Sequence, residues 1–530
     1  MSSPKGSKIM TQSPSARPSV SESILIMDFG SQYSRLIARR IREANVYCEL
    51  ISPHTEWETV SKLNAKGVIL SGGPASVYSS DAPIAPDWVY SKKLPVLGIC
   101  YGMQLLTSQM GGSVEPAKIR EYGHAKLMHD ADHPILKGIT NETTVWMSHG
   151  DRVTKLPEGF KPLAHTLNSS VAIMGNNNNM IGLQFHPEVA HTQEGSKLLN
   201  NFLFDICKCT GDWTPGNFVT QAIEDLRNTI GTGKVICALS GGVDSAVVAT
   251  LIHRAVGTQL TSIFVDNGLL RKDEAIRVQD MFAKHFDMKI IHVKAEDEFL
   301  DNLKGVTDPE DKRKIIGKTF IEIFDRAAKE IGTVDFLAQG TLYPDVIESE
   351  TKENSGAAKI KTHHNVGGLP ETMKLHLVEP VRYLFKDEVR EVGKSLGMPM
   401  EMLMRQPFPG PGLAIRIIGE ITAEKLRMVR DCDWIVMDEI KQSGMYYDIW
   451  QSFAVLTDTK TVGVMGDYRT YGHVVAIRAV TSDDAMTADW VRLPYANLTN
   501  ISNRIVNEVP GVNRVVLDIT SKPPGTIEWE

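Results

Sequence analysis

The sequence predicts an α/β protein with two doubly wound domains, each a parallel sheet covered by helices, followed by a small α+β domain. Short apolar runs alternate with amphipathic segments from residue 24 to residue 110, and this alternation returns between 235 and 338. Parallel strands need crossover connections, so such alternation is typical of a sheet with helices on both faces. After residue 405 the order of elements changes, which indicates the third domain.

Length and composition are those of a multidomain globular protein. The chain has 530 residues, of which 42% are hydrophobic and 23% charged. A net charge of −7 gives no overall basic field, so neither nucleic acid nor a membrane surface is expected as a partner. The six cysteines are sparse for this length, which favours a reducing compartment, and we expect a cytosolic protein.

Four segments are expected along the chain. Residues 1–21 are rich in Ser and Pro and lack the apolar region of a secretory signal, so they predict a disordered tail. The domains are expected at 22–210, 211–404 and 405–530, with a linker near 211–217. In the first domain, the shorter runs after residue 112 predict hairpins near a sheet edge.

The expected elements follow from hydrophobic periodicity. Strands are expected at 24–27, 47–51, 68–70, 96–99, 181–185, 235–239, 260–265, 290–293, 336–338, 453–456, 473–480 and 512–519. Helices are expected at 32–44, 101–110, 195–207, 218–230, 273–286, 314–331, 423–441 and 489–509. In a doubly wound domain ligands bind beyond the carboxyl ends of the strands, where Ser240 and Asp266 both fall.

A cysteine in the first domain stands in the pattern G-x-C-x-G, from Gly98 to Gly102, between a predicted strand and a predicted helix. This is the cysteine form of a nucleophile elbow, a sharp turn that exposes the central side chain. A free thiol with a pKa of about 8.5 is mostly protonated at neutral pH, and a helix N-terminus and an imidazole favour the thiolate. Cys100 is therefore the predicted nucleophile, with His186 as base and Glu188 as the carboxylate that orients it.

Isolated cysteines and histidines are usually structural, so the cysteine prediction depends on the combination of features. A glycine turn at 71–74 follows another strand of the same sheet and offers backbone N–H groups for an oxyanion. Cys207 and Cys209 are too close for a C-x₂-C zinc half-site, and we interpret them as structural residues at a helix end.

The second domain contains a second strand-turn-helix signature. The residues are Ser240, Gly241, Gly242, Val243, Asp244, Ser245 and Ala246. Two glycines allow close approach of the backbone to a ligand, and a helix N-terminus offers unpaired N–H groups to phosphate. No lysine follows the glycines, which excludes the P-loop pattern G-x-x-x-x-G-K-S/T. A turn without a ligand is the alternative, and the full pattern favours phosphate.

The motifs at 71–74, 98–104 and 185–188 resemble those of the class I glutamine amidotransferases, which have a flavodoxin-like fold. This resemblance implies that Cys100 attacks the side-chain amide of glutamine and that hydrolysis of the thioester frees ammonia. It also makes the N–H groups of Gly73 and Tyr101 the oxyanion donors and places Gln104 beside the substrate.

The loop at 240–245 resembles the PP-loop of ATP pyrophosphatases, whose fold is adenine-nucleotide α-hydrolase-like. With the stretches at 264–271, 337–349, 364–370, 407–414 and 522–530, the chain is similar to the glutamine-hydrolysing GMP synthetase family over residues 24–530. The resemblance implies ATP with Mg²⁺ at the loop, no organic cofactor, and formation of GMP from xanthosine monophosphate (XMP) through adenylyl-XMP. By the same resemblance, XMP contacts Arg313, Arg514, Lys522, Ile527 and Glu528.

Several weaker predictions accompany this resemblance. The segment 312–314 is either a solvated helix start or a mobile lid, and Lys361 is expected near the nucleotide. His363 and His364 suggest a metal, but no acid or cysteine has ligand spacing, so no metal held by the protein alone is expected. Residues 522–530 are expected to dock rather than fray. The third domain resembles a dimerisation domain and predicts a homodimer, although size alone also allows a monomer.

Two other classes of function stay open from the residues alone. One is a different PP-loop amidotransferase, such as a glutamine-dependent NAD synthetase or an asparagine synthetase. Those enzymes take ammonia from a nitrilase-like or N-terminal-nucleophile domain, which the cysteine elbow disfavours. The other is a nucleotide-sensing module without activity, which the intact Cys100, His186 and Glu188 disfavour.

Overall fold

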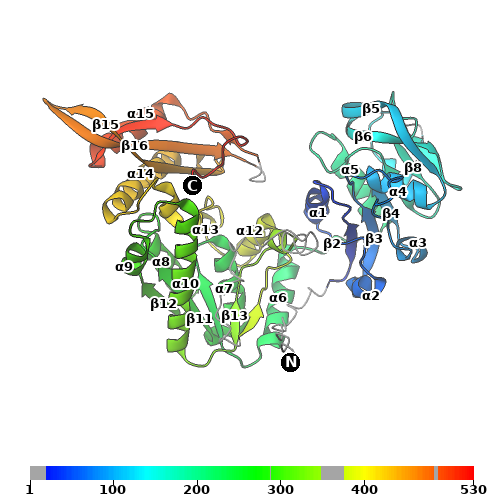
Figure 1. Cartoon of the computed structure of the whole chain (residues 1–530). Helices are drawn as coiled ribbons and strands as arrows, with labels where there is room; N and C mark the ends of the chain where they lie inside the picture. Colours follow the sequence, from blue (N-terminus) through cyan, green and yellow to red (C-terminus); the bar gives the residue numbers. More distant parts are fainter. Residues whose placement is uncertain (1–19, 130, 287, 348–374, 483–486) are drawn as a thin grey trace, which may run out of the picture. The chain divides into compact units, whose positions relative to one another are not determined.

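The computed structural model describes residues 20–129, 131–286, 288–347, 375–482 and 487–530. These residues form two compact units, one that ends at Phe218 and one that begins at Val219 (Figure 1). Most of the predicted tail, together with Lys361 and the pair His363 and His364, lies outside the described residues.

The first unit is built on a seven-stranded sheet with the order β2-β1-β3-β4-β9-β8-β7. The five parallel strands are β1 (Ser23–Met27), β2 (Cys48–Ile51), β3 (Ala65–Leu70), β4 (Val96–Ile99) and β9 (Met180–Leu183). The helices are α1 (Ser34–Glu43), α2 (Trp57–Val60), α3 (Trp88–Ser91), α4 (Tyr101–Gln109) and α5 (Gly195–Asn200). Strands such as β4 and β9 are buried throughout, as expected for a parallel sheet covered on both faces.

The antiparallel part of this unit agrees only partly with the sequence. β7 (Lys161–Ala164) and β8 (Ile173–Gly175) form a hairpin at the sheet edge, as predicted. β5 (Ser113–Leu127) and β6 (Thr143–Lys155) form a separate two-stranded sheet, and both are longer than the runs expected there. The helix predicted at 195–207 changes after α5 into a π-helical turn, Asn201–Ile206. Cys209 follows this turn, and burial raises the pKa of its thiol to about 12, which agrees with a structural role.

The second unit contains a five-stranded parallel sheet with the order β12-β11-β10-β13-β14. Its strands are β10 (Val235–Leu239), β11 (Leu260–Asp266), β12 (Ile290–Lys294), β13 (Phe336–Ala338) and β14 (His376–Val378). Its helices are α6 (Pro215–Ile230, which starts in the first unit), α7 (Val243–Val256), α8 (Glu274–Phe286), α9 (Glu296–Leu303), α10 (Pro309–Ile331), α12 (Lys386–Ser395) and α13 (Met400–Leu403). The strand order reverses at β10, so the loop that begins with Ser240 lies at the topological switch point of the sheet.

Two helices begin earlier than the sequence predicts. α6 starts at Pro215, inside the predicted linker, where Thr214 Oγ1 accepts the N–H of Asn217 at 3.3 Å. α10 starts at Pro309 because the carboxylate of Asp308 caps the N–H groups of its first turn. The segment 312–314 therefore lies in the first turns of a helix, where Lys314 is exposed but Lys312 is fully buried, so the interpretation as a solvated helix start is wrong for Lys312.

The C-terminal part of the second unit is the predicted α+β layer. Its strands are β15 (Gln451–Met465), β16 (Tyr468–Thr481), β17 (Asp489–Trp490) and β18 (Val512–Leu517), and its helices are α14 (Ala423–Gln442) and α15 (Tyr495–Glu508). The helix predicted from 489 begins at Tyr495 instead, because 489–490 pair with β16. One hydrophobic core joins Ile263 of the parallel sheet with Val429 and Leu456 of this layer, so the predicted boundary at 404 and 405 falls inside a continuous core.

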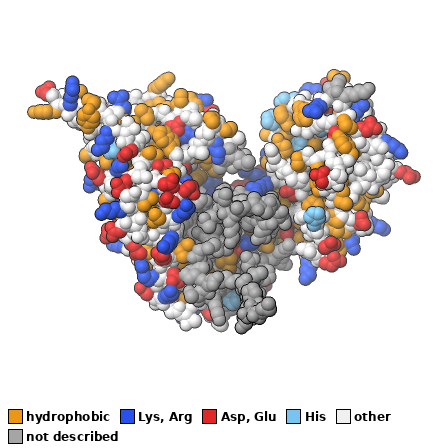
Figure 2. Space-filling view, viewed as in Figure 1, with side chains coloured by type: hydrophobic (Ala, Val, Ile, Leu, Met, Phe, Trp, Pro, Cys, Tyr) orange, Lys and Arg blue, Asp and Glu red, His pale blue; other side chains and the backbone are white. Residues whose placement is uncertain are grey.

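The predicted fold class is confirmed by these sheets and their connections. Among the described residues, no helix is both long enough and apolar enough to cross a membrane. On the face shown in Figure 2, acidic and basic side chains are interspersed over the surface of each unit.

Candidate active sites

Cys100 occupies the sharp turn between β4 and α4 with φ 52° and ψ −105°. A positive φ is uncommon for a residue with a side chain and is often found where function requires strain. Packing explains the flanking glycines: a Cβ on Gly98 would lie 2.5 Å from the carbonyl oxygen of Gly102, and a Cβ on Gly102 would collide with Leu70 of β3. The turn is held to the sheet by the N–H of Cys100, which donates to the carbonyl of Leu183 at 2.7 Å.

His186 and Glu188 follow β9, the strand beside β4, and this places both side chains at the elbow. His186 Nδ1 lies 2.7 Å from Glu188 Oε1, and the interactions of the ring with Glu188 and with the Cys100 thiol both favour its charged form. Burial lowers the pKa of His186, but the bonds to Cys100 and Glu188 outweigh it and raise that pKa to about 10. The imidazole is therefore a strong acceptor for the thiol proton. The three side chains together have the geometry of a cysteine-histidine-carboxylate triad.

The glycine turn predicted to bind an oxyanion packs directly against the triad. A Cβ on Gly72 would lie 3.2 Å from His186 Cε1, and one on Gly73 would lie 2.9 Å from the carbonyl oxygen of Phe29. Tyr101 is the first residue of α4, where an N–H has no acceptor within the helix. Gln104, one turn further on, donates through Nε2 to the carbonyl of Asp151 at 3.2 Å. The structure thus brings together the elbow, the glycine turn, the histidine and the acid.

The segment 148–151 of β6 also lies at this site, although the sequence did not predict it. The carbonyl of Ser148 lies 3.7 Å from Cys100 Sγ. The next residue, His149, is buried, and its Nε2 lies 3.2 Å from Oε2 of Glu121. The carboxylate of Asp151 accepts hydrogen bonds from the hydroxyl groups of Ser76 and Tyr78. A glycine inside a strand of polar residues was the available signal. The proximity of the segment 148–151 to the elbow depends on how the β5-β6 sheet packs against the seven-stranded sheet.

The PP-loop closes on itself through its two serines. The N–H of Ser240 donates to Ser245 Oγ at 3.2 Å, and the two hydroxyl oxygens lie 3.1 Å apart. Gly241 has φ 76°, which glycine adopts without strain, and Gly242 forms the extended N-cap of α7. Val243, Asp244 and Ser245 form the first turn of the helix, followed by Ala246. Helical first-turn N–H groups at the switch point are suited to phosphate.

Asp244 has one carboxylate oxygen with a partner and one without. Oδ2 lies 3.3 Å from Lys386 Nζ, at the start of α12. Oδ1 is buried and has no hydrogen-bond partner among the described residues. Within these residues no group of three His, Cys, Asp or Glu side chains could hold a metal ion. A carboxylate oxygen beside a phosphate loop fits Mg²⁺ that is bound mainly by phosphates and water. Asp266 lies at the same sheet edge, as predicted, and accepts the N–H of Gly268 at 3.2 Å.

Three of the predicted XMP residues meet at the end of the chain. Arg313 of α10 donates to the main-chain oxygen of Glu530. Glu528 accepts two bonds from Arg416, at 3.2 and 3.0 Å. Ile527 packs on a small cluster of buried residues from β15 and β16.

The other two predicted XMP residues make their contacts elsewhere in the C-terminal layer. Arg514 of β18 donates to Thr461 Oγ1 at 3.3 Å, and Lys522 pairs through its main chain with Ala488. Further along the segment, the buried Lys312 pairs with Glu530, and the buried Arg478 donates to the carbonyl of Thr526 at 2.9 Å. The prediction that 522–530 dock is confirmed.

The fold and the two sites define a glutamine amidotransferase joined to an ATP-using PP-loop unit. Family comparison agrees. Residues 25–206 match the family described as Glutamine amidotransferase class-I, residues 217–314 match NAD synthase, and residues 438–529 match the GMP synthase C terminal domain. The crystal structure of a putative GMP synthase subunit from Thermoplasma acidophilum, 29% identical, covers 35% of this chain and 94% of its own, with a TM-score of 0.31.

Full-length relatives narrow the class. GMP synthase (glutamine-hydrolyzing) of Dehalococcoides mccartyi is 63% identical over 97% of this chain and 96% of its own. The enzyme of the same name from Thermomicrobium roseum is 58% identical over 96% of this chain and 97% of its own. The chain belongs to the family of glutamine-hydrolysing GMP synthases. It is therefore an enzyme, a carbon-nitrogen ligase, and the alternatives of another PP-loop amidotransferase or an inactive sensor are wrong.

Proposed function

We propose that the chain makes GMP, AMP, pyrophosphate and glutamate from XMP, ATP and glutamine, with its domains at 22–210, 211–404 and 405–530. Glutamine is hydrolysed at Cys100, and the ammonia is used at the PP-loop. The observation that carries this proposal is the His186–Glu188 pair, whose imidazole interacts with Cys100, in the same chain as the PP-loop.

In the first half-reaction the Cys100 thiolate attacks the carboxamide carbon of glutamine while His186 holds the thiol proton. The N–H groups of Gly73 and Tyr101 stabilise the oxyanion that forms. As the tetrahedral intermediate collapses, the carbon-nitrogen bond breaks, and His186 gives its proton to the departing ammonia. Water, with His186 as base, then cleaves the thioester to release glutamate and restore the thiol. Glu188 keeps the imidazole oriented throughout.

In the second half-reaction the C2 oxygen of XMP attacks the α-phosphorus of ATP, and pyrophosphate leaves. Residues 240–246 would bind the phosphates through their N–H groups and hydroxyls, and Asp244, whose Oδ1 has no hydrogen-bond partner among the described residues, would hold Mg²⁺ together with the phosphates. Mg²⁺, when bound there, supplies positive charge to the leaving pyrophosphate. Ammonia then attacks C2, and AMP leaves. Arg514 and Lys522 are proposed to hold the XMP phosphate, Arg313 to contact XMP, and Ile527 and Glu528 to contact its base. No organic cofactor is required.

Ammonia links the two half-reactions. In neutral water it gains a proton and ceases to be a nucleophile, so we propose that it passes between the sites without entering bulk solvent. Glutamine hydrolysis is then expected to be slow until ATP and XMP occupy the second site. Full-rate glutamine hydrolysis in the absence of XMP would contradict this coupling.

We infer a cytosolic homodimer that associates through the C-terminal layer. The β15-β16 hairpin exposes Val464, Tyr468 and Tyr471 by 74%, 79% and 72%, and Figure 2 shows hydrophobic side chains along this projecting arm. Exposed apolar side chains gathered on one arm favour a protein contact. Analytical ultracentrifugation of the wild type and of Tyr468→Asp tests this, and a monomeric wild type at micromolar concentration contradicts it.

The overall reaction is tested by supplying ATP, XMP and glutamine and measuring the products. GMP, AMP, pyrophosphate and glutamate are expected in equal amounts, and an ammonium salt should replace glutamine. Formation of ADP and phosphate would refute the PP-loop chemistry. Omission of XMP is the matched control, since it removes the acceptor and leaves both nucleotide and nitrogen donor in place.

A further inference from the structure

A network of charged residues extends through the second unit between the PP-loop and the C-terminal segment. Its members are Arg405, Glu274, Arg271, Asp433, Arg416 and Glu528. Neither proposed half-reaction assigns a role to the five residues that precede Glu528. They come from four separate parts of the sequence, so only the folded unit brings them together.

One end of this charge network lies at the PP-loop. Arg405 Nη1 donates to the carbonyl of Gly241 at 2.8 Å, and its other terminal nitrogen pairs with Glu274. The second carboxylate oxygen of Glu274 accepts the main-chain N–H of Arg271 at 3.0 Å, so this link is a hydrogen bond and not an ion pair. Arg271 Nε in turn lies 3.1 Å from Asp433 Oδ2, on the buried face of α14. The loop carbonyl is therefore tied to α14 by groups that are largely shielded from water.

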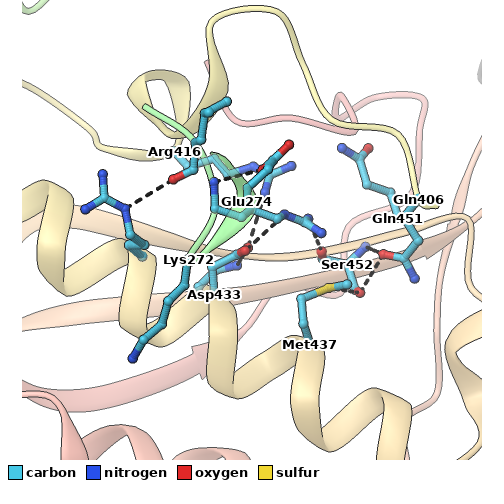
Figure 3. Close-up of polar contacts among 12 residues, drawn as sticks. Lys272, Glu274, Gln406, Arg416, Asp433, Met437, Gln451 and Ser452 are labelled. Carbon is cyan, nitrogen blue, oxygen red and sulfur yellow. Dashed lines mark hydrogen bonds and ion pairs between the residues drawn. The ribbon is translucent and has the colours of Figure 1, made fainter. Parts of the chain in front are cut away.

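Near the other end of the charge network, Arg416 precedes Glu528 and is fully buried. Its guanidinium packs against two aromatic rings, with the ring centroid of Phe408 5.1 Å from Cζ and that of Phe453 4.1 Å from Cζ. Nη1 donates to Asp433 Oδ1 at 3.2 Å, and Nε and Nη2 donate to the two oxygens of Glu528 (Figure 3 shows Arg416 and Asp433). Hydrogen bonds to two carboxylates and the packing of two aromatic rings thus restrict the orientation of this side chain.

We propose that Arg416 is a positioning residue for XMP recognition: its planar fork sets the orientation of the Glu528 carboxylate that meets the purine base. This inference depends on the proposed contact between Glu528 and XMP. A bidentate guanidinium fixes the plane of a carboxylate, which a single ammonium cannot do. Asp433 holds the guanidinium from the opposite edge, so the carboxylate is oriented before XMP arrives.

A stability role alone explains this arrangement poorly. Buried ion pairs contribute little net stability, because desolvation of both charges offsets their attraction. Gln451 Nε2 also donates to Glu528 Oε1 at 2.6 Å, so this one carboxylate receives donors from two separate side chains. Such convergence restricts direction, and the direction of an acceptor is what recognition of a purine N–H requires.

The test is Arg416→Lys, which keeps the positive charge and removes the fork. With ammonium as nitrogen source, we expect the KM for XMP to rise about tenfold. The KM for ATP and the rate of glutamine hydrolysis should stay within about twofold, because Arg416 contacts neither the PP-loop nor the first unit's triad. Arg504→Lys is the matched control: Arg504 also binds two carboxylates of α14, Asp438 and Glu439, but lies away from Glu528. It should leave the KM for XMP unchanged.

Two further variants separate positioning from folding. Asp433→Asn keeps the shape and leaves the fork to Glu528 in place, so a smaller rise in the KM for XMP is expected. In a double-mutant cycle, Arg416→Lys combined with Glu528→Gln should be no worse for XMP than Glu528→Gln alone, because Arg416 acts through that carboxylate.

The inference is overturned if Arg416→Lys leaves the KM for XMP unchanged while Glu528→Gln raises it. It is also overturned if kcat and both KM values worsen in parallel with a loss of thermal stability, since that pattern indicates a structural residue. If Glu528→Gln itself leaves the KM for XMP unchanged, the proposed contact between Glu528 and XMP fails, and this inference fails with it.

Discussion

The two candidate sites are assembled in different ways. In the first unit, the elbow, the glycine turn and the histidine with its acid all follow neighbouring strands of one sheet, β4, β3 and β9. In the second unit only the PP-loop is built like this. The proposed XMP residues come from α10, β18 and the segment 522–530, which is held in place by contacts across the unit. A triad made of strand ends is in place once its sheet forms, whereas the second site also needs the end of the chain to dock.

The difference extends to the electrostatics. The triad uses one buried carboxylate and one imidazole; burial lowers the pKa of His186, but the interactions with Cys100 and Glu188 outweigh it and raise that pKa. The second unit buries whole cations, Lys312, Arg416 and Arg478, whose partners include residues of the C-terminal segment. Since an unpaired buried charge is strongly unfavourable, that segment is part of the fold as well as part of the proposed site. The predictions below test this contrast, from the largest expected effect to the smallest.

Cys100→Ala should separate the two sites most completely. Glutamine-dependent GMP synthesis should fall by at least about 10⁴-fold, because no other group supplies the nucleophile. Synthesis from ammonium should stay at the wild-type rate, because the second unit keeps all its residues. Cys432→Ser, in the second unit, is the control and should keep the ratio of the two activities. Loss of both activities in Cys100→Ala would mean that the sites are not separable.

Deletion of residues 527–530 should abolish the reaction of the second unit and leave the first unit folded. It removes Glu528, one of the two carboxylate partners of the buried Arg416, and Glu530, the carboxylate partner of the buried Lys312, and breaking a buried pair costs about 3–5 kcal/mol. GMP synthesis should become undetectable with either nitrogen donor, and the second unit should melt at a lower temperature. The first unit should keep its own unfolding transition in calorimetry. A truncated chain with normal GMP formation would show that the segment is dispensable.

Glu188→Gln should lower glutamine hydrolysis roughly a hundredfold, because the imidazole loses its orienting charge. It should also change the pH dependence of stability. The folded pKa of His186 is raised to about 10 from 6.5, so its charged form stabilises the first unit fully below pH 6.5, and this contribution is lost as pH rises towards 10. The difference in melting temperature between wild type and variant should therefore be largest at pH 6 and shrink by pH 10. A difference that grows with pH would contradict the raised pKa.

Gly241→Ala should produce the smallest effect, roughly a tenfold loss of kcat with either nitrogen donor. Its φ of 76° is unfavourable for alanine, and the new Cβ would lie 3.3 Å from Glu274 Oε1. Gly397→Ala is a close match, with φ 73° and no atom within 4 Å of the new Cβ. It should cost similar stability and leave kcat unchanged. Equal kcat in both variants would show that the loop tolerates the strain.

The sequence by itself determined the parts whose contacts are local. The elbow around Cys100 and the loop 240–245 are each a strand, a turn and a helix within a few residues, so glycine spacing and apolar runs predict them. The same holds for the sheets: alternation predicts parallel strands, and parallel strands place their following loops at one edge. That is why His186 and Glu188 could be predicted beside a cysteine more than eighty residues away.

The tertiary structure alone decided what depends on docking between distant segments. Asp433 stands among other charged residues in an amphipathic helix, and nothing in its spacing distinguishes it from a solvated residue, yet it is buried between two arginines. Lys312 looked like part of an exposed helix start and is fully enclosed. Ser148 reaches the elbow only because a neighbouring sheet folds over it. Periodicity records which face of an element is apolar, but it carries no information on which distant charge will neutralise a buried one.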